Sequence, residues 1–318
     1  MSGLETSPRV LVIFPGALGD LICAAPAIRA FGRMNPDMRI ELMARAELAD
    51  FAARRLGVAA GYSIDRREMS AMFREGGAED PAAQTFFGQF DKICSFFAFD
   101  DANYRRALCA VSAGPVTFHQ FRPPGAGHVA ELYLKSIGAP NEPIDLRIEF
   151  SAGDFEHANE ISRLDLVPGG FVMIFPGSGS AKKNWDAKKF ARLALEIEEQ
   201  MRLRPVAVLG PAEVDLAPLF RDFGISAASM QPLESVAALA SFAAGFAGND
   251  SGVSHLAAAA GARGVVIFGP TDPGRWRPLG RVTVVRAAEL DSLEVKPVLN
   301  ALKDACKDVS ADAAQALH

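Results

Sequence analysis

Short apolar runs alternate with amphipathic stretches along most of the chain. The first apolar run, Arg9–Pro15, is followed by residues 21–34, whose apolar positions recur at helical spacing. Such runs without internal alternation are typical of parallel strands that are buried on both faces. The pattern predicts further strands at 37–45, 59–65, 92–98 and 114–121, and then at 171–177, 204–211 and 264–270.

The stretches between these runs predict helices. Apolar residues at helical spacing cover 47–56, 154–166, 184–201, 212–224 and 233–246, and a helical tail follows at the C-terminus. Strand–helix alternation of this kind predicts an α/β protein whose parallel sheets carry helices on both faces.

The alternation loosens between Gly138 and Gly170, where Pro, Asn, Gly and acidic residues dominate, and we expect a domain junction there. On its two sides, "VLVIFPGALGD" and "FVMIFPGSGSA" begin almost identically. We therefore expect two Rossmann-like parallel-sheet domains, residues 1–155 and 156–318, that face each other across a central cleft.

Composition narrows the classes of protein. With a net charge of −5 and no basic stripe, the 318-residue chain is not expected to bind nucleic acid. Its four cysteines lie far apart without a C-x-x-C pair, which favours reduced thiols and a cytoplasmic location. The chain has no apolar run of about 20 residues, so contact with the inner face of the membrane would be at most peripheral.

Ligands of open parallel sheets bind beyond the carboxyl ends of the strands. Five loops rich in small and polar residues follow apolar runs: "GALGD", "GSGSAKKNW", "GPAEVD", "GNDSGVSH" and "GPTDPGRW". In "GNDSGVSH", Asp250 and Ser251 can cap the next helix, whose start at Gly252 offers free amides to an anion. His255 falls in the first turn, where it either contacts the ligand or bonds to its own loop.

The loop "GSGSAKKNW" suits a diphosphate. Ser178 and Ser180 offer hydroxyl groups, and Lys183 offers positive charge, although a solvated loop would have the same composition. It is not a Walker A motif. Glu213, just after a strand, either accepts hydrogen bonds from a ribose or serves as an acidic residue at a helix start.

The first loop, with Gly16 and Gly19, lacks the three spaced glycines of a dinucleotide fingerprint. Asp20 either caps the first helix or acts as a general base. Arg122, with Arg105, Arg106 and two histidines, makes the first half locally basic and could meet an acidic acceptor, although such residues usually form a solvated face. The five histidines have no metal-ligand spacing and D-x-D is absent, so no metal site is expected.

These loops resemble those of the bacterial ADP-heptose:lipopolysaccharide heptosyltransferases of glycosyltransferase family 9. The resemblance is carried by "VLVIFPGALGDLICAAPAIRAF", "FPGSGSAKKNWDAKKFARLALEI", "LGPAEVDLA" and "AGNDSGVSHLAAAAGARGVVIFGPTDPGRWRP". It implies a GT-B fold, with the acceptor on the first domain and the nucleotide-sugar donor on the second, and a C-terminal helix that can pack back on the first domain. It also implies inverting, metal-independent transfer from ADP-L-glycero-D-manno-heptose to a lipopolysaccharide inner-core or related glycan or glycolipid acceptor, without a cofactor.

The resemblance also implies roles for individual residues. Asp20 matches the proposed general base, and Gly16, Gly19 and Arg122 lie on the acceptor side. The residues that it places at the donor diphosphate are Ser178, Ser180, Lys183, Ser251 and Gly252. Those at the donor nucleoside or sugar are Glu213, Asp250 and His255.

The chain departs from the family that it resembles at Phe14 and Pro15, where many members carry a basic residue, which leaves the identity of the acceptor open. Two alternatives within enzymes stay open: a family relative with another nucleotide sugar and acceptor, or a GT-B-type sugar-nucleotide epimerase. A nucleotide-binding module without catalysis is a third alternative.

Overall fold

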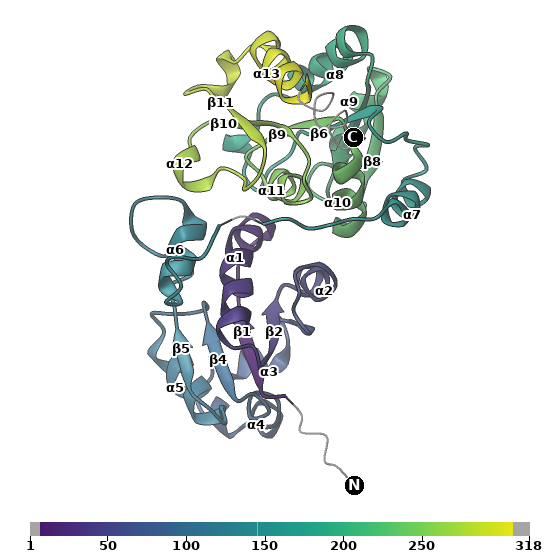
Figure 1. The fold of residues 1–318 in the computed structure, drawn as a ribbon. Coiled ribbons are helices and arrows are strands. Elements are labelled where there is room, and N and C mark those ends of the chain that lie inside the picture. The colour runs from purple at the N-terminus through teal and green to yellow at the C-terminus, as the bar shows by residue number, and fades with distance from the viewer. Residues whose placement is uncertain (1–6, 145, 308–318) are drawn as a thin grey trace. The chain divides into compact units, whose positions relative to one another are not determined.

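The computed structural model describes residues 7–144 and 146–307. The chain divides into two compact units, Met1–Ile144 and Asp145–His318 (Figure 1). The boundary expected at 155/156 lies inside helix α7 (Ala152–Ser162), which packs against α10 (Leu233–Phe242). Because α7 is built into the second unit, the junction comes before it.

Five parallel strands form the sheet of the first unit, in the order β3-β2-β1-β4-β5. The central strand β1 pairs with both β2 and β4, and from Val10 to Ile13 it is fully buried, as the unbroken apolar run predicts. The strands are β1 (Arg9–Ile13), β2 (Arg39–Ala44), β3 (Ala60–Ser63), β4 (Lys92–Ser95) and β5 (Val116–Phe118).

Side chains of β1 alternate between two apolar layers. Leu11 and Ile13 join a core formed with α3, α4 and α5, whereas Val12 faces α1 on the other side of the sheet. Helix α1 in turn packs against α6. The helices are α1 (Leu18–Met34), α2 (Ala46–Arg55), α3 (Arg67–Ala71), α4 (Pro81–Phe87), α5 (Ala102–Val111) and α6 (Val129–Ser136), with a 3₁₀ turn η1 (Gly77–Glu79).

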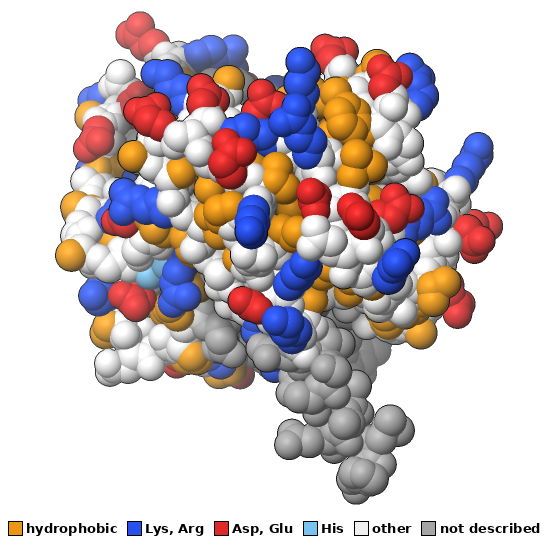
Figure 2. Space-filling view, turned by 90° about the horizontal axis from the view of Figure 1, so that it is seen from above, with side chains coloured by type: hydrophobic (Ala, Val, Ile, Leu, Met, Phe, Trp, Pro, Cys, Tyr) orange, Lys and Arg blue, Asp and Glu red, His pale blue; other side chains and the backbone are white. Residues whose placement is uncertain are grey.

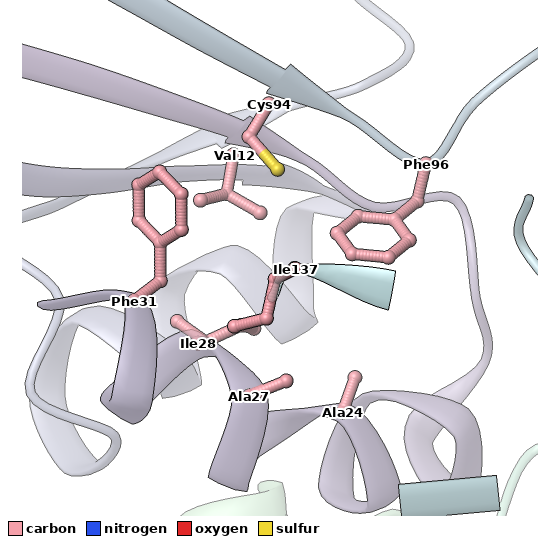
Figure 3. Close-up of a pocket in the computed structure, with 8 residues that line it drawn as sticks. All are labelled: Val12, Ala24, Ala27, Ile28, Phe31, Cys94, Phe96 and Ile137. Atoms are coloured by element: carbon pink, nitrogen blue, oxygen red, sulfur yellow. The ribbon is translucent and has the colours of Figure 1, made fainter. Parts of the chain in front are cut away.

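A small cavity of about 10 Å³ lies between β1, β4 and α1 (Figure 3). All its lining side chains are apolar, so the cavity offers a water molecule no set of hydrogen-bond partners and is a packing void. Burial raises the pKa of the Cys94 thiol there to about 11, which keeps this cysteine protonated and unreactive. The lining residues are Val12, Ala24, Ala27, Ile28, Phe31, Cys94, Phe96 and Ile137.

A buried hydrogen-bonded ion pair joins β1, β2 and β3. Glu41 is 1% exposed and accepts hydrogen bonds from Arg9 Nε at 2.9 Å, Arg9 Nη2 at 2.8 Å and Tyr62 Oη at 2.7 Å. Burial by itself would raise the pKa of the Glu41 carboxyl, but the hydrogen bonds from Arg9 and Tyr62 hold the pKa below its usual value.

Glu41→Gln is expected to destabilise the first unit by about 1–3 kcal/mol at neutral pH, because Arg9 loses its counter-ion while remaining partly buried. The folded-state pKa of Glu41 is depressed, so its stabilisation is complete above the ordinary value of 4.5 and is lost as the pH falls through the folded pKa. Thermal unfolding across this range should show a smaller loss of stability on acidification in Glu41→Gln than in the unchanged protein. Exposed Glu47→Gln is the control and should follow the unchanged protein.

The second unit contains six parallel strands in the order β11-β10-β9-β6-β7-β8. Every residue of β6, β9 and β10 is buried, because these strands occupy the middle of the sheet. The strands are β6 (Phe171–Phe175), β7 (Arg204–Leu209), β8 (Ser226–Ser229), β9 (Gly245–Asn249), β10 (Gly264–Phe268) and β11 (Val282–Arg286).

Two apolar cores cover the two faces of this sheet. Val172 and Ile174 of β6 face a core that includes α8 and α13, and Met173 faces a core that includes α7, α10 and α11. Besides α7 and α10, the helices are α8 (Ala187–Met201), α9 (Ala217–Asp222), α11 (Gly252–Ala259), α12 (Pro273–Trp276) and α13 (Val295–Lys307), and the 3₁₀ turns are η2 (Ala181–Lys183), η3 (Val214–Leu216) and η4 (Leu290–Ser292).

One element predicted from the sequence is wrong. The helix expected over 233–246 ends at Phe242, and Gly245–Asn249 forms the strand β9 between β6 and β10. The described part of the C-terminal helix, α13, packs on α8, β9, β10 and β11. Residues 308–318 lie outside the described part.

Charges of both signs are interspersed on the face of the protein shown in Figure 2, where Lys and Arg side chains alternate with Asp and Glu side chains. All four cysteines are free. Within the described ranges, no helix is both long enough and apolar enough to span a membrane.

Candidate functional site

Four of the five polar loops singled out in the sequence follow neighbouring strands of the second sheet, β10, β9, β6 and β7, and lie at one edge of it. This convergence follows from their parallel pairing, which places all their carboxyl ends on the same side. Asp250 stands directly after β9, and its backbone N–H donates to the carbonyl of Ile267 in β10 at 3.0 Å.

A three-residue hydrogen-bonded group joins three of these loops. Lys183 Nζ donates to Asp250 Oδ2 at 3.0 Å, and Thr271 Oγ1 donates to the same oxygen at 2.6 Å. The Asp250 side chain is 6% exposed, whereas that of Lys183 is 26% exposed. A carboxylate so deeply buried requires partners of this kind, and Lys183 stays accessible to a ligand from solvent.

Asn249, the last residue of β9, connects the Lys183 loop to the sheet. Its Nδ2 donates to the Pro176 carbonyl at 2.7 Å, and its Oδ1 accepts the Trp185 N–H at 3.0 Å. Trp185 is 1% exposed, and its indole N–H donates to the Leu293 carbonyl at 2.9 Å. These bonds fix the chain on both sides of Lys183, so its position at the edge is set by the fold.

The amino terminus of α11 points its first amides out of the helix at the same edge. Ser251 precedes α11 in an extended conformation, without a side-chain cap bond. Within the described residues, the N–H groups of Gly252 and Val253 donate to no acceptor. Free amides and the positive end of the helix together suit a bound anion.

His255 is buried, at 4% exposure, in the first turn of α11. Beside it, Ser254 Oγ donates to the Asn249 carbonyl at 2.7 Å and lies 3.2 Å from Ser251 Oγ. The serine hydroxyls therefore tie α11 to the end of β9.

The two other predicted serines lie in the loop that carries Lys183. Ser178 Oγ is placed to donate to the Ser180 carbonyl at 2.8 Å or to Asn184 Oδ1 at 2.5 Å, and it accepts the Ser180 N–H at 3.2 Å. Ser178 therefore closes its own loop, while the Ser180 side chain is exposed.

Glu213 joins the loops after β6 and β7. A methyl group on Gly177 would lie 2.1 Å from Glu213 Cδ, and one on Gly210 would lie 3.0 Å from its Oε2. The carboxylate thus occupies space that only glycines leave open, next to the loop of Lys183.

In the first unit, Asp20 lies in the first turn of α1, just beyond the end of β1. The helix begins at Leu18 with Ala17 as its N-cap residue, so Asp20 is not the N-cap itself; as the third helical residue, it accepts the Ala17 N–H through Oδ2 at 3.1 Å. A methyl group on Gly16 would lie 2.7 Å from Asp20 Cβ and 2.5 Å from Phe14 Cε1, which explains the glycine at this turn. Gly19 is the second residue of α1.

Phe14, which with Pro15 marks the expected departure from the family, is fully buried. Its ring makes edge-to-face contacts with Phe96, Phe121 and Tyr133 at centroid distances of 5.6–5.8 Å. Its role is therefore packing beneath the loop of Asp20.

Basic residues of the first unit contact aromatic rings or a helix backbone. Arg122 is exposed, with its guanidinium 5.5 Å from the centroid of the Phe121 ring, and Arg105 covers the Phe118 ring at 4.8 Å. His119 stacks on Phe96, and burial lowers its pKa. His128 caps α6, where its Nδ1 accepts the Ala130 N–H at 3.2 Å.

The structure thus brings together Lys183, Asp250 and the start of α11, with Glu213 beside the Lys183 loop. Sequence reasoning missed Thr271 and Asn249 as members of this group. Both stand in quoted loops, and the surplus of polar residues in "GNDSG" was the signal for Asn249. In the described ranges, no three His, Cys, Asp or Glu side chains cluster so as to hold a metal ion.

Two parallel-sheet α/β domains, with the ammonium group of Lys183 and the start of α11 at the carboxyl edge of the second, are the architecture of the GT-B fold. The family model of glycosyltransferase family 9 (heptosyltransferase) matches residues 128–299. The chain belongs to this family.

Solved structures share the fold at low sequence identity. A family 9 glycosyl transferase from Veillonella parvula matches with a TM-score of 0.77 and 17% identity, over 96% of this chain and 100% of that one. The E. coli ADP-heptose lps heptosyltransferase II matches with a TM-score of 0.73 and 16% identity, over 95% of this chain and 99% of that one. The E. coli heptosyltransferase WaaC with ADP matches with a TM-score of 0.67 and 19% identity, over 92% of this chain and 98% of that one. No curated protein matches the chain in sequence.

Proposed function

We propose that this glycosyltransferase transfers a heptose from ADP-L-glycero-D-manno-heptose to a lipopolysaccharide inner-core or related glycan acceptor, with inversion and without a metal ion. The observation that carries the proposal is the group formed by Lys183, Asp250 and the free amides of α11 at the carboxyl edge of the second sheet. The family and the two heptosyltransferases that share the fold support a heptose donor.

On the donor side, the departing diphosphate gains negative charge as its bond to the sugar breaks. Lys183 supplies a positive charge, and the amides of Gly252 and Val253 supply hydrogen bonds from a positive helix end. Groups that are already held in place stabilise such charge without reorganisation. In the proposed reaction they take the part that a divalent cation plays in metal-dependent transfer.

On the acceptor side, Asp20 takes the proton of the acceptor hydroxyl group while the oxygen of that hydroxyl group attacks the anomeric carbon of the donor sugar. The new carbon–oxygen bond forms on the face opposite to the bond that breaks, so the configuration inverts and ADP leaves with the electron pair. The hydrogen bond from Ala17 to Oδ2 fixes the carboxylate at the start of α1. A positioned general base of this kind contributes about 10²- to 10⁴-fold to the rate.

The donor is tested by thermal shift with ADP, UDP, GDP, CDP and NAD. ADP at about 100-fold its dissociation constant should stabilise the protein by about 2.7 kcal/mol, and the other ligands should do less. If UDP or GDP stabilised the protein most, the donor would be a UDP- or GDP-linked sugar instead. If NAD stabilised it most, the transferase proposal would be overturned.

The reaction is tested by nuclear magnetic resonance of the products. Transfer with inversion gives ADP and a glycoside of opposite anomeric configuration, and it requires an acceptor. Conversion of the nucleotide sugar without an acceptor would identify an epimerase instead, and binding without turnover over a panel of acceptors would identify a nucleotide-binding module.

Gly177→Ala is expected to weaken ADP binding by about tenfold, because the new methyl group displaces the Glu213 carboxylate that we place at the ribose. Gly179→Ala in the same loop is the matched control, since nothing lies within 4 Å of the added atom. Calorimetric titration with ADP measures both variants. Equal affinities for the two variants would remove Glu213 from the nucleoside site.

A further inference from the structure

We infer that Thr271 is a positioning residue of the donor site, which holds the Asp250 carboxylate in place when Lys183 leaves it for the donor diphosphate. The inference rests on the proposed function, because it requires a diphosphate that competes for Lys183. It concerns a hydroxyl group that lies in the loop between β10 and α12, outside the residues expected from the sequence.

Both partners of Asp250 bind the same oxygen. Oδ2 accepts from Lys183 Nζ at 3.0 Å and from Thr271 Oγ1 at 2.6 Å, whereas Oδ1 accepts from no residue in the described ranges. The arrangement leaves Oδ1 as an acceptor for a hydroxyl group of the ligand. It also leaves Thr271 as the one described side chain that bonds to the carboxylate once Lys183 has moved.

The two partners differ in how freely they can move. The ammonium group of Lys183 lies at the end of a long side chain that is 26% exposed. A diphosphate presents more negative charge to this ammonium group than one carboxylate does. Thr271 has a short side chain, and the next residue, Asp272, caps α12. When a ligand takes Lys183, the 6% exposed carboxylate would lose its counter-ion, and the hydroxyl bond offsets part of that cost.

The hydroxyl of Thr271 is not required to start α12. Asp272 caps that helix, since its Oδ1 accepts the Gly274 N–H at 2.9 Å and its carbonyl accepts the Trp276 N–H at 3.0 Å. The Thr271 hydroxyl group therefore donates its hydrogen bond to Asp250 rather than to an acceptor in its own loop. This separates a role at the donor site from a role in local folding.

The test is the affinity for ADP of Thr271→Val, which keeps the shape of the side chain and removes the hydroxyl group. We expect about a tenfold loss of affinity by calorimetry, the loss typical of a hydrogen bond to a charged group. Thr271→Ser should restore the affinity, because it restores the bond. The matched control is Thr85→Val in α4, where the hydroxyl bonds only to the Pro81 carbonyl.

A second readout needs no ligand. Lys183→Met imitates the departure of the lysine, so Thr271→Val should lower the melting temperature more in that background than in the unchanged protein. Equal losses in both backgrounds would mean that Thr271 acts independently of Lys183, as a purely structural residue does.

The possible failures can be told apart. If the unchanged protein binds ADP and Thr271→Val binds it equally well, or if Thr271→Ser fails to restore binding, the inference is overturned and the proposed function stands. If the unchanged protein binds none of the nucleoside diphosphates, the proposed function fails and the inference fails with it.

Discussion

Asp20→Asn is expected to lower the rate of sugar transfer by about 10²- to 10⁴-fold and to leave ADP affinity unchanged. The amide cannot take the proton of the acceptor hydroxyl at neutral pH. It retains an oxygen that can accept the Ala17 N–H, so the start of α1 is preserved. The measurements are initial rates with saturating donor and calorimetric titration with ADP.

Asp154→Asn provides the matched control for this substitution. Asp154 occupies the same position in α7, where its Oδ2 accepts the Ser151 N–H at 2.7 Å, and it lies in the second unit. This variant should transfer sugar at the rate of the unchanged protein. Transfer by Asp20→Asn at the unchanged rate would show that another group takes the proton.

Lys183→Met is expected to weaken ADP binding by about 10- to 100-fold, because a charge-assisted hydrogen bond to the diphosphate is lost. The same change leaves the buried Asp250 carboxylate without its counter-ion, so the melting temperature of the free protein should fall as well. Calorimetry and thermal unfolding measure the two effects separately.

Lys182→Met is the matched control, since it removes a neighbouring lysine that is exposed and forms no ion pair within the described residues. It should bind ADP like the unchanged protein. If the two variants lost affinity equally, general positive charge on the loop would matter rather than the held position of Lys183.

The helix starts show where sequence reasoning stops. Asp20 had two interpretations, N-cap or general base; the structure gives the N-cap position to Ala17, whose N–H Asp20 accepts from within the first turn, and does not test the base. His128 was placed among basic residues that could meet an acceptor, yet its ring nitrogen caps α6. A polar residue at a helix start fits both uses, because bonds to the helix backbone and bonds to a ligand employ the same donor and acceptor groups.

Thr271 and Asn249 show a second limit. Each belongs to a loop that the sequence marked as polar, but neither residue type carries a chemistry of its own. Their importance comes from partners far away in the chain: Thr271 meets Asp250, and Asn249 meets Trp185. Such pairings depend on the order of the strands, and a single sequence does not give that order.

Local pattern also misled at one strand. Residues 233–246 contain many alanines and no break by proline, which favours one long helix. The structure ends α10 at Phe242 and uses Gly245–Asn249 as β9, where the pairing with β6 and β10 outweighs local helix preference. Without this strand, Asp250 would not reach the carboxyl edge.

The fold class could be predicted from the sequence alone, because apolar runs separated by amphipathic helices are typical of parallel sheets, and small polar loops after those runs mark the edge at which a ligand binds. The sequence also located Lys183 and Asp250. The tertiary structure decided that these two form an ion pair and that Thr271 shares its carboxylate oxygen. The physical reason is that hydrophobic periodicity and loop chemistry act over a few residues, whereas hydrogen bonds between loops depend on which strands become neighbours in the folded sheet.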